Sequence, residues 1–186
     1  MRCLNVKFIL SEEMIVDLIT IKERTSSFDF SIEPAQIDLE SETARVKSVV
    51  EVQGKIKKGI VQVDVEGKIS AVVEVECDRC LQSVEKSLEF PFDAAFVTPD
   101  NYTQAKEAEL NQDDLEVSIY AGDKIDLSEL AREQIILNLP EQTFCRDDCK
   151  GLCPKCGANR NLIDCNCEEK EVDPRWEGLR ELKIKN

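Results

Sequence analysis

The chain has 186 residues, nine cysteines, no histidine and a net charge of −14. This length allows one ordinary domain with an appendage, and a hydrophobic content of 42% is enough for a core. Without histidine, the chain can form neither a histidine-based catalytic site nor a mixed cysteine/histidine metal site. No apolar run approaches the roughly 18 residues of a membrane span, and Asn5 and Lys7 interrupt the only candidate signal segment. We therefore expect a cytoplasmic protein without a membrane partner, whose clustered thiols stay reduced.

Charge divides the chain into two parts. Residues 1–144 carry 15 basic and 29 acidic side chains, whereas residues 145–186 carry nine of each. The acidic part repels nucleic-acid phosphates and favours a basic protein partner, so the neutral part is the better candidate for a weak contact with ribosomal RNA. The alternative is that the acidity serves solubility alone.

The N-terminal region predicts two short strands. Residues 1–13 have no clear pattern, and we expect Met14 to be the natural start, with the preceding residues an extension. Residues 14–19 are strand-like, and residues 28–32 alternate between apolar and polar side chains before Pro34.

The clearest strand pattern begins after residue 45. Apolar and polar side chains alternate in one strand at 46–56, and a turn at 57–59 leads into a longer strand at 61–77. Gly67 lies in the middle of the longer strand, where it predicts a bend or a bulge.

The chain then turns at 77–80 and returns as a strand at 84–97, which Pro91 should break. Residues 100–114 are polar and acidic and predict a loop or mobile insert, and residues 115–120 predict one more strand. Together, these strands predict an antiparallel meander with one buried face, or a partly closed barrel.

A single helix is expected at 127–139. Asp126 is a good N-cap, Glu129 completes a capping box, and Pro140 ends the helix. The predicted fold is therefore α+β, with a mainly antiparallel β domain at 1–144 and a C-terminal zinc-ribbon-like module.

The C-terminal module, residues 145–186, ends in a predicted amphipathic helix opened by Pro174. Its apolar stripe consists of Trp176, Leu179 and Leu182. The stripe either docks on the body of this chain or binds a partner.

Six cysteines fall within 23 residues of this module, and in a reduced environment this density indicates a metal site. They are Cys145, Cys149, Cys153, Cys156, Cys165 and Cys167. The sequence Cys153-Pro-Lys-Cys156-Gly has the spacing of a zinc knuckle, and Cys165 and Cys167 can supply the closing pair. Cys149 could replace either member of that pair, because ligands one residue apart must strain to reach one ion. The alternative is a reduced, metal-free cluster.

Four thiolates fill the coordination sphere of zinc, which indicates a structural ion with no ligand position left for a substrate. The seven glycines form no nucleotide-binding fingerprint, so nucleotide binding is not expected. We also expect no small-molecule substrate.

A further Cys-x-x-Cys motif, Cys77-Asp-Arg-Cys80, lies between two strands, whereas thioredoxin-type chemistry uses such a motif at the start of a helix. Together with Cys145 and Cys149, these two cysteines could form a second four-thiolate site. The alternative is a pair of structural thiols at a hairpin tip.

Several motifs occur in a characteristic order. They are Cys77-Asp-Arg-Cys80-Leu81, Ile125-Asp-Leu-Ser-Glu-Leu130, Glu133-Gln-Ile135, Cys149-Lys-Gly-Leu-Cys153-Pro-Lys-Cys156-Gly-Ala-Asn159, Cys165-Asn-Cys167 and Asp173-Pro-Arg175. In this order, across residues 14–185, they resemble the YceD family of bacterial and plastid proteins, which are named for accumulation of large-subunit ribosomal RNA. The chain departs from the family pattern at Arg160, where an apolar residue is usual.

This resemblance implies a non-enzymatic role in synthesis, processing or stability of 23S ribosomal RNA, and so in assembly of the large ribosomal subunit. With an acidic body, we expect the chain to act through a ribosomal protein or an assembly factor that is basic. Some relatives lack the C-terminal cysteines, which implies that zinc is a stabilising accessory. The alternative function is a thiol- or metal-responsive cytoplasmic adaptor that uses Cys77 and Cys80.

Overall fold

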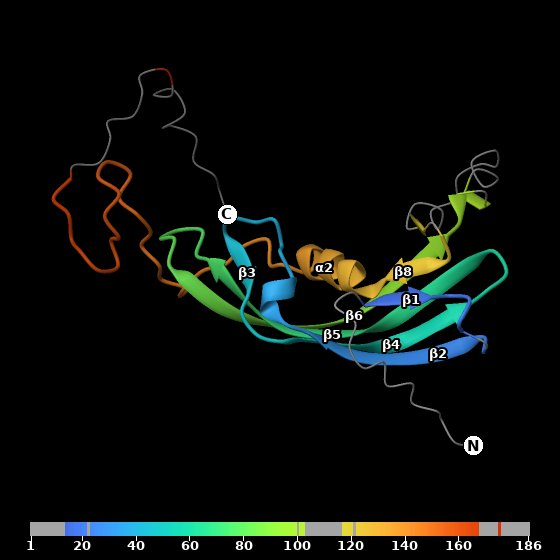
Figure 1. Cartoon of the computed structure of the whole chain (residues 1–186). Coiled ribbons are helices and arrows are strands. Elements are labelled where there is room, and N and C mark those ends of the chain that lie inside the picture. Colours follow the sequence, from blue (N-terminus) through green and yellow to red (C-terminus); the bar gives the residue numbers. More distant parts are fainter. Residues whose placement is uncertain are drawn as a thin grey trace, which may run out of the picture.

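A curved six-stranded sheet forms the body of the protein (Figure 1). The computed structural model describes residues 14–21, 23–99, 101–102, 117–120, 122–167 and 175. The strand order is β2-β4-β5-β6-β7, and β3 also pairs with β5. The strands are β2 (Thr25–Ile32), β3 (Ala44–Val46), β4 (Val50–Lys58), β5 (Gln62–Glu76), β6 (Ser83–Val97) and β7 (Val117–Ile119).

The remaining elements lie over the concave face of this sheet (Figure 1). They are a two-stranded sheet, β1 (Ile15–Asp17) with β8 (Lys124–Asp126), the short 3-10 helix η1 (Pro34–Gln36) and the helix α2 (Leu127–Leu137). In the described part of the chain, no helix is long and apolar enough to cross a membrane.

Alternation of apolar and polar residues explains the core. Every second residue of β5 from Val63 to Val75, except Gly67, is buried, and the residues between them face outward. The apolar side of α2 packs against this face through Leu127, Leu130, Ala131 and Ile135. The predicted meander is confirmed, since β4, β5 and β6 are consecutive antiparallel neighbours.

The predicted barrel is wrong, because the sheet stays open. In the described residues, β2 and β6 lie on opposite sides of the sheet and do not pair with each other. The concave face is covered instead by α2, β1 and β8, which complete the core without closure.

Two predictions about strand continuity are also wrong. The strand expected at 46–56 is two strands, because Val46 pairs with Val73 whereas Glu51 pairs with Ser70. The extra residues form a bulge in which the N–H groups of Lys47 and Ser48 both donate to the carbonyl of Val72.

Pro91 does not break β6, which pairs with β5 without interruption from Ser83 to Val97. A proline is tolerated there because, in the described part of the chain, no strand pairs with the other side of this part of β6, where an N–H donor would otherwise be needed. Pairing also continues through Gly67, so this glycine makes no bulge. A Cβ atom on Gly67 would lie 2.4 Å from the carbonyl oxygen of Gln53, so the close approach of β4 requires glycine here.

The C-terminal part of the body differs from the prediction in pairing. The strand expected at 115–120 is β7, which pairs parallel with the end of β6 rather than antiparallel. The pairing of β8 with β1 was not predicted from the sequence. The N-cap is confirmed, since the Asp126 carboxylate accepts from the N–H groups of Ser128 and Glu129. The Glu129 side chain pairs with Arg132 instead of returning to the cap.

Three expectations lie outside the described residues: the extension at 1–13, the central part of the loop at 103–114 and the tail helix that contains Trp176.

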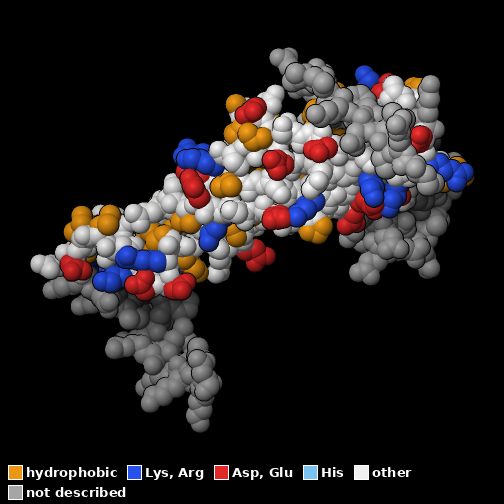
Figure 2. All heavy atoms as spheres, turned by 90° about the horizontal axis from the view of Figure 1, so that it is seen from below, with side chains coloured by type: hydrophobic (Ala, Val, Ile, Leu, Met, Phe, Trp, Pro, Cys, Tyr) orange, Lys and Arg blue, Asp and Glu red, His pale blue; other side chains and the backbone are white. Residues whose placement is uncertain are grey.

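The convex face of the sheet carries the polar residues of β2, β4, β5 and β6. Figure 2, seen from below, shows acidic and basic side chains interspersed over this face.

Candidate metal centres

The eight described cysteines are free thiols that lie in two groups of four. The docking group consists of Cys77, Cys80, Cys145 and Cys149, and the distal group consists of Cys153, Cys156, Cys165 and Cys167. Within each group all four sulfurs lie within 4.8 Å of one another. Each group could therefore hold a metal ion.

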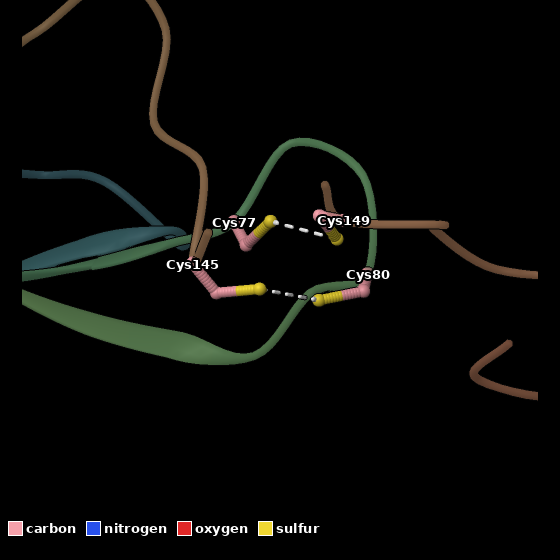
Figure 3. A group of neighbouring side chains, drawn as sticks. All are labelled: Cys77, Cys80, Cys145 and Cys149. Carbon is pink, nitrogen blue, oxygen red and sulfur yellow. Dashed lines mark hydrogen bonds between the residues drawn. The ribbon is translucent and has the colours of Figure 1, made fainter. Parts of the chain in front are cut away.

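The docking group joins the tip of the β5–β6 hairpin to the start of the cysteine-rich module. Its four side chains point toward one another (Figure 3). The Sγ atoms of Cys77 and Cys149 are 3.9 Å apart, and those of Cys80 and Cys145 are 3.6 Å apart. Around a tetrahedral zinc ion with bonds of about 2.3 Å, sulfurs lie about 3.8 Å from one another. The spacing of these pairs fits such an ion and is far too long for disulfides.

Both Cys-x-x-Cys turns have the same backbone hydrogen bonds. In each turn, the N–H of the fifth residue donates to the carbonyl of the first cysteine, whose own N–H donates to the carbonyl of the sixth residue. The bonds are Leu81 N to Cys77 O at 2.8 Å, Gly157 N to Cys153 O at 2.9 Å, Cys77 N to Gln82 O at 2.9 Å and Cys153 N to Ala158 O at 2.8 Å. The hairpin tip thus has the conformation of the knuckle in the module, which the sequence alone did not show.

Hydrogen bonds to sulfur favour a thiolate at the first position of each turn. Burial raises the pKa of Cys77, but the N–H groups of Cys145, Arg79 and Cys80 outweigh burial and lower its pKa to about 6. The N–H groups of Cys156 and Lys155 likewise lower the pKa of Cys153 to about 6.

The last thiols to ionise have the opposite shift. Burial and the neighbouring Cys149 raise the pKa of Cys145 to about 12. Cys156, followed by burial, raises the pKa of Cys167 to about 12. Repulsion between sulfurs therefore opposes four thiolates in each group, and a divalent cation would remove that repulsion.

The turns differ at the residue after the second cysteine. Gly157 has a φ angle of 73°, which glycine adopts freely, whereas Leu81 has a φ angle of 59°, which is costly for a leucine. The side chain of Leu81 is 57% exposed, so burial does not compensate for this conformation. The strained conformation of Leu81 is therefore part of the turn that directs the N–H groups at the sulfur of Cys77.

Arg79 joins the hairpin tip to the module. Its guanidinium lies 4.2 Å from the ring centroid of Phe144 and donates to the carbonyls of Asp147 and Cys149, both at 3.2 Å. Its own carbonyl accepts from the N–H of Leu152 at 2.9 Å. The Cys-x-x-Cys motif by itself gives no indication of this bridging role.

Two further polar side chains hold the docking group. The carboxylate of Asp78 accepts from the N–H of Thr143 at 2.6 Å. The side-chain amide of Asn161 donates to the sulfur of Cys149 at 3.3 Å, and its oxygen accepts from the N–H of Lys150. Asn161 thus donates a hydrogen bond to a candidate metal ligand and helps to orient it. The sequence gives no signal for this role, since the side chain is twelve residues away from the sulfur that it contacts.

The structure divides the sequence-predicted residues between the groups. It places both Cys165 and Cys167 beside Cys153, and it places Cys149 with Cys77 rather than with either of them. The groups also differ in burial. Cys77, Cys80 and Cys149 are buried, whereas in the distal group only Cys153 is buried and Cys156 is exposed.

Comparison with known proteins finds similar proteins in bacteria and plants. An uncharacterised protein of Mycobacterium tuberculosis is 28% identical over 177 residues, covering 93% of this chain and 83% of its own. The uncharacterised protein YlbN of Bacillus subtilis is 27% identical over 169 residues, covering 90% of this chain and 94% of its own. The large ribosomal RNA subunit accumulation protein YCED homolog 1, chloroplastic, of Zea mays is 26% identical over 191 residues, covering 90% of this chain and 63% of its own.

No solved structure matches the chain. The family model for the large ribosomal RNA subunit accumulation protein YceD matches residues 65–183, which include both cysteine groups. The chain belongs to the YceD family.

Proposed function

We propose that the protein is a non-enzymatic factor that supports the synthesis, processing or stability of 23S ribosomal RNA during assembly of the large ribosomal subunit. The observation that carries this proposal is membership of a family named for accumulation of the large ribosomal RNA. Two plant chloroplast relatives carry the same description. We expect the protein to act in the cytoplasm.

We propose that both cysteine groups bind structural zinc. Four soft thiolates at tetrahedral spacing suit zinc, and a complete set of four ligands leaves no open position for catalysis. The docking-group ion would hold the module on the hairpin tip, and the distal-group ion would close the module itself. Metal analysis of the purified chain should find two zinc ions per chain, and iron in their place would contradict this assignment.

We propose a basic protein, such as a ribosomal protein or an assembly factor, as the direct partner. The acidic excess of residues 1–144 opposes contact with RNA phosphates. Four thiolates around one Zn²⁺ also leave a formal charge of about −2 on each group. Any weak contact of residues 145–186 with ribosomal RNA would thus depend on their nine lysines and arginines and should disappear as the salt concentration rises.

Depletion of the protein tests the proposed role. The ratio of 23S to 16S ribosomal RNA should fall, and sucrose gradients should show fewer large subunits, while re-expression of the protein restores both. Normal gradients combined with an altered response to thiol stress would contradict the proposal and support the adaptor. We do not favour that adaptor, because Cys77 and Cys80 are buried and contact the module.

A further inference from the structure

The strand β2 forms an open edge of the main sheet (Figure 1). It pairs with β4 through eight consecutive residues, Thr25 to Ile32, without a bulge. Among the described residues, no other strand pairs with β2. The outer side of β2 is therefore a row of backbone groups without strand partners in the described structure.

The ladder determines which of these groups face outward. The N–H of Lys58 donates to the carbonyl of Arg24, which makes this a hydrogen-bonded pair directly before β2. In an antiparallel ladder, such pairs alternate with pairs whose backbone groups point away from the partner. The outward-pointing groups thus belong to Thr25, Ser27, Asp29 and Ser31. The same alternation, continued through β5, turns the nitrogen of Pro91 toward the open edge of β6, where proline is tolerated.

The two open edges differ in how they are protected. Beyond the short pairing with β7, the edge of β6 carries two features that discourage strand pairing. Pro91 lacks an N–H donor, and Lys86 lies opposite the buried Val73, on the side of the core. No lysine, arginine, proline or glycine occurs in β2.

The side chains of β2 indicate what kind of strand it would accept. Phe28 and Phe30 are only partly buried on the core side, with ring centroids 5.9 Å apart. Asp29 lies between them on the opposite face and is the only charged residue in the strand. A neighbouring strand would therefore gain most from apolar residues beside the two rings and from a lysine or arginine beside Asp29.

We propose that β2 binds an extended segment of a basic protein, which adds to the sheet as a further strand with alternating apolar and cationic side chains. This inference rests on the basic partner of the proposed function and locates its contact on the chain. A second copy of the chain is a poorer occupant, because two molecules that each carry a charge of −14 repel one another.

A synthetic probe tests the pairing directly. A fluorescein-labelled peptide of alternating valine and lysine, long enough to cover β2, should bind the full chain in fluorescence anisotropy. Two matched peptides should not bind: one with glutamate in place of lysine, and one with N-methyl groups on alternate residues, which removes the backbone donors but keeps the charge. Equal binding of the N-methylated peptide would overturn the proposal, because contact would then depend on charge alone.

Substitutions in the chain test the edge itself. Asp29→Pro removes an outward N–H that the ladder with β4 does not use, and it should weaken peptide binding at least about tenfold with an unchanged thermal midpoint. Ser27→Pro should do the same and serves if Asp29→Pro fails to fold. Asp29→Asn should weaken binding less and reduce its salt dependence. Ser87→Pro, at an equivalent position on the open edge of β6, should leave binding unchanged.

Two other outcomes would overturn the inference. One is full peptide binding by both proline variants. The other is a concentration-dependent dimer of the wild-type chain that Asp29→Pro dissociates, since β2 would then pair with a second copy.

Complementation separates this inference from the proposed function. If depletion lowers 23S ribosomal RNA and Asp29→Pro restores it fully, the function stands and the edge is not its contact. If depletion leaves 23S ribosomal RNA unchanged, the proposed function fails whatever the peptide result.

Discussion

The docking group and the distal group start from the same backbone turn but have different surroundings. In the docking group, the pairs of sulfurs in contact are separated by 72 and 65 residues in the chain. In the distal group all four cysteines lie between residues 153 and 167. A metal ion that cross-links distant residues would restrict the unfolded chain more than one that closes a short loop, although this effect grows only slowly with loop length. The same local motif can therefore hold two parts of a protein together or only shape one loop.

The two groups should differ most in how much stability the protein loses when the cysteines of one group are replaced. Cys77→Ser/Cys149→Ser should lower the free energy of unfolding by roughly 4 kcal/mol, the scale of opening a cross-linked loop of this length. Cys153→Ser/Cys156→Ser should leave the free energy of unfolding of the sheet, followed by its β signal, within about 1 kcal/mol of wild type. Circular dichroism during denaturation measures both, and metal analysis should show one zinc lost in each variant. Similar destabilisation by both variants would contradict the contrast.

The next largest difference in stability should be between substitutions of Arg79 and of Lys155, which occupy the same position in the two turns. Arg79→Met removes the stacking on Phe144 and two charge-assisted hydrogen bonds, and it should cost about 2–3 kcal/mol. Lys155 occupies the matching position of the second turn, where its side chain is exposed. Lys155→Met should change stability by no more than about 0.5 kcal/mol. Equal effects in urea denaturation would mean that Arg79 does not bridge the two parts.

The rate at which a chelator removes metal should depend on how deeply the cysteines of each group are buried. The distal group, with Cys156 exposed, should lose zinc to EDTA about tenfold faster than the docking group, most of whose sulfurs are buried. A zinc-sensitive dye should therefore report two phases. The fast phase should be missing in Cys153→Ser/Cys156→Ser and kept in Cys77→Ser/Cys149→Ser. A fast phase lost only in the latter variant would reverse the assignment.

The smallest effects concern the positive φ angles. Leu81→Gly should stabilise the protein by about 1 kcal/mol, because it relieves a left-handed conformation without uncovering a buried side chain. Gly157→Ala should cost about 1 kcal/mol, although nothing within 4 Å would contact the added methyl group. Thermal denaturation of the two variants should show shifts of opposite sign. If Leu81→Gly is destabilising, its exposed side chain has a contact that outweighs the strain.

Much of the fold could be predicted from local patterns. Alternation in β5, the N-cap at Asp126 and the knuckle spacing at Cys153 all depend on interactions between residues close in the chain, and the structure has each of them. The predictions of strand continuity failed where the outcome depends on a strand that is distant in the sequence. The bulge before Val50 arises because β3 and β4 pair with β5 in different registers. The strand β6 continues through Pro91 because no strand within the described ranges pairs with its outer side at that position.

The cysteines show the same division. The sequence by itself determined that a transition-metal site here must use thiolates, with carboxylates as the fallback, because the chain has no histidine. It also predicted the knuckle turn at Cys153–Cys156, whereas the matching turn at Cys77–Cys80 became evident only in the structure. Only the tertiary structure decided that Cys145 and Cys149 join Cys77 and Cys80, and that β4 is the only strand paired with β2 among the residues described. Both depend on which distant segments meet, and such contacts arise from packing of the whole core rather than from the spacing of neighbouring residues.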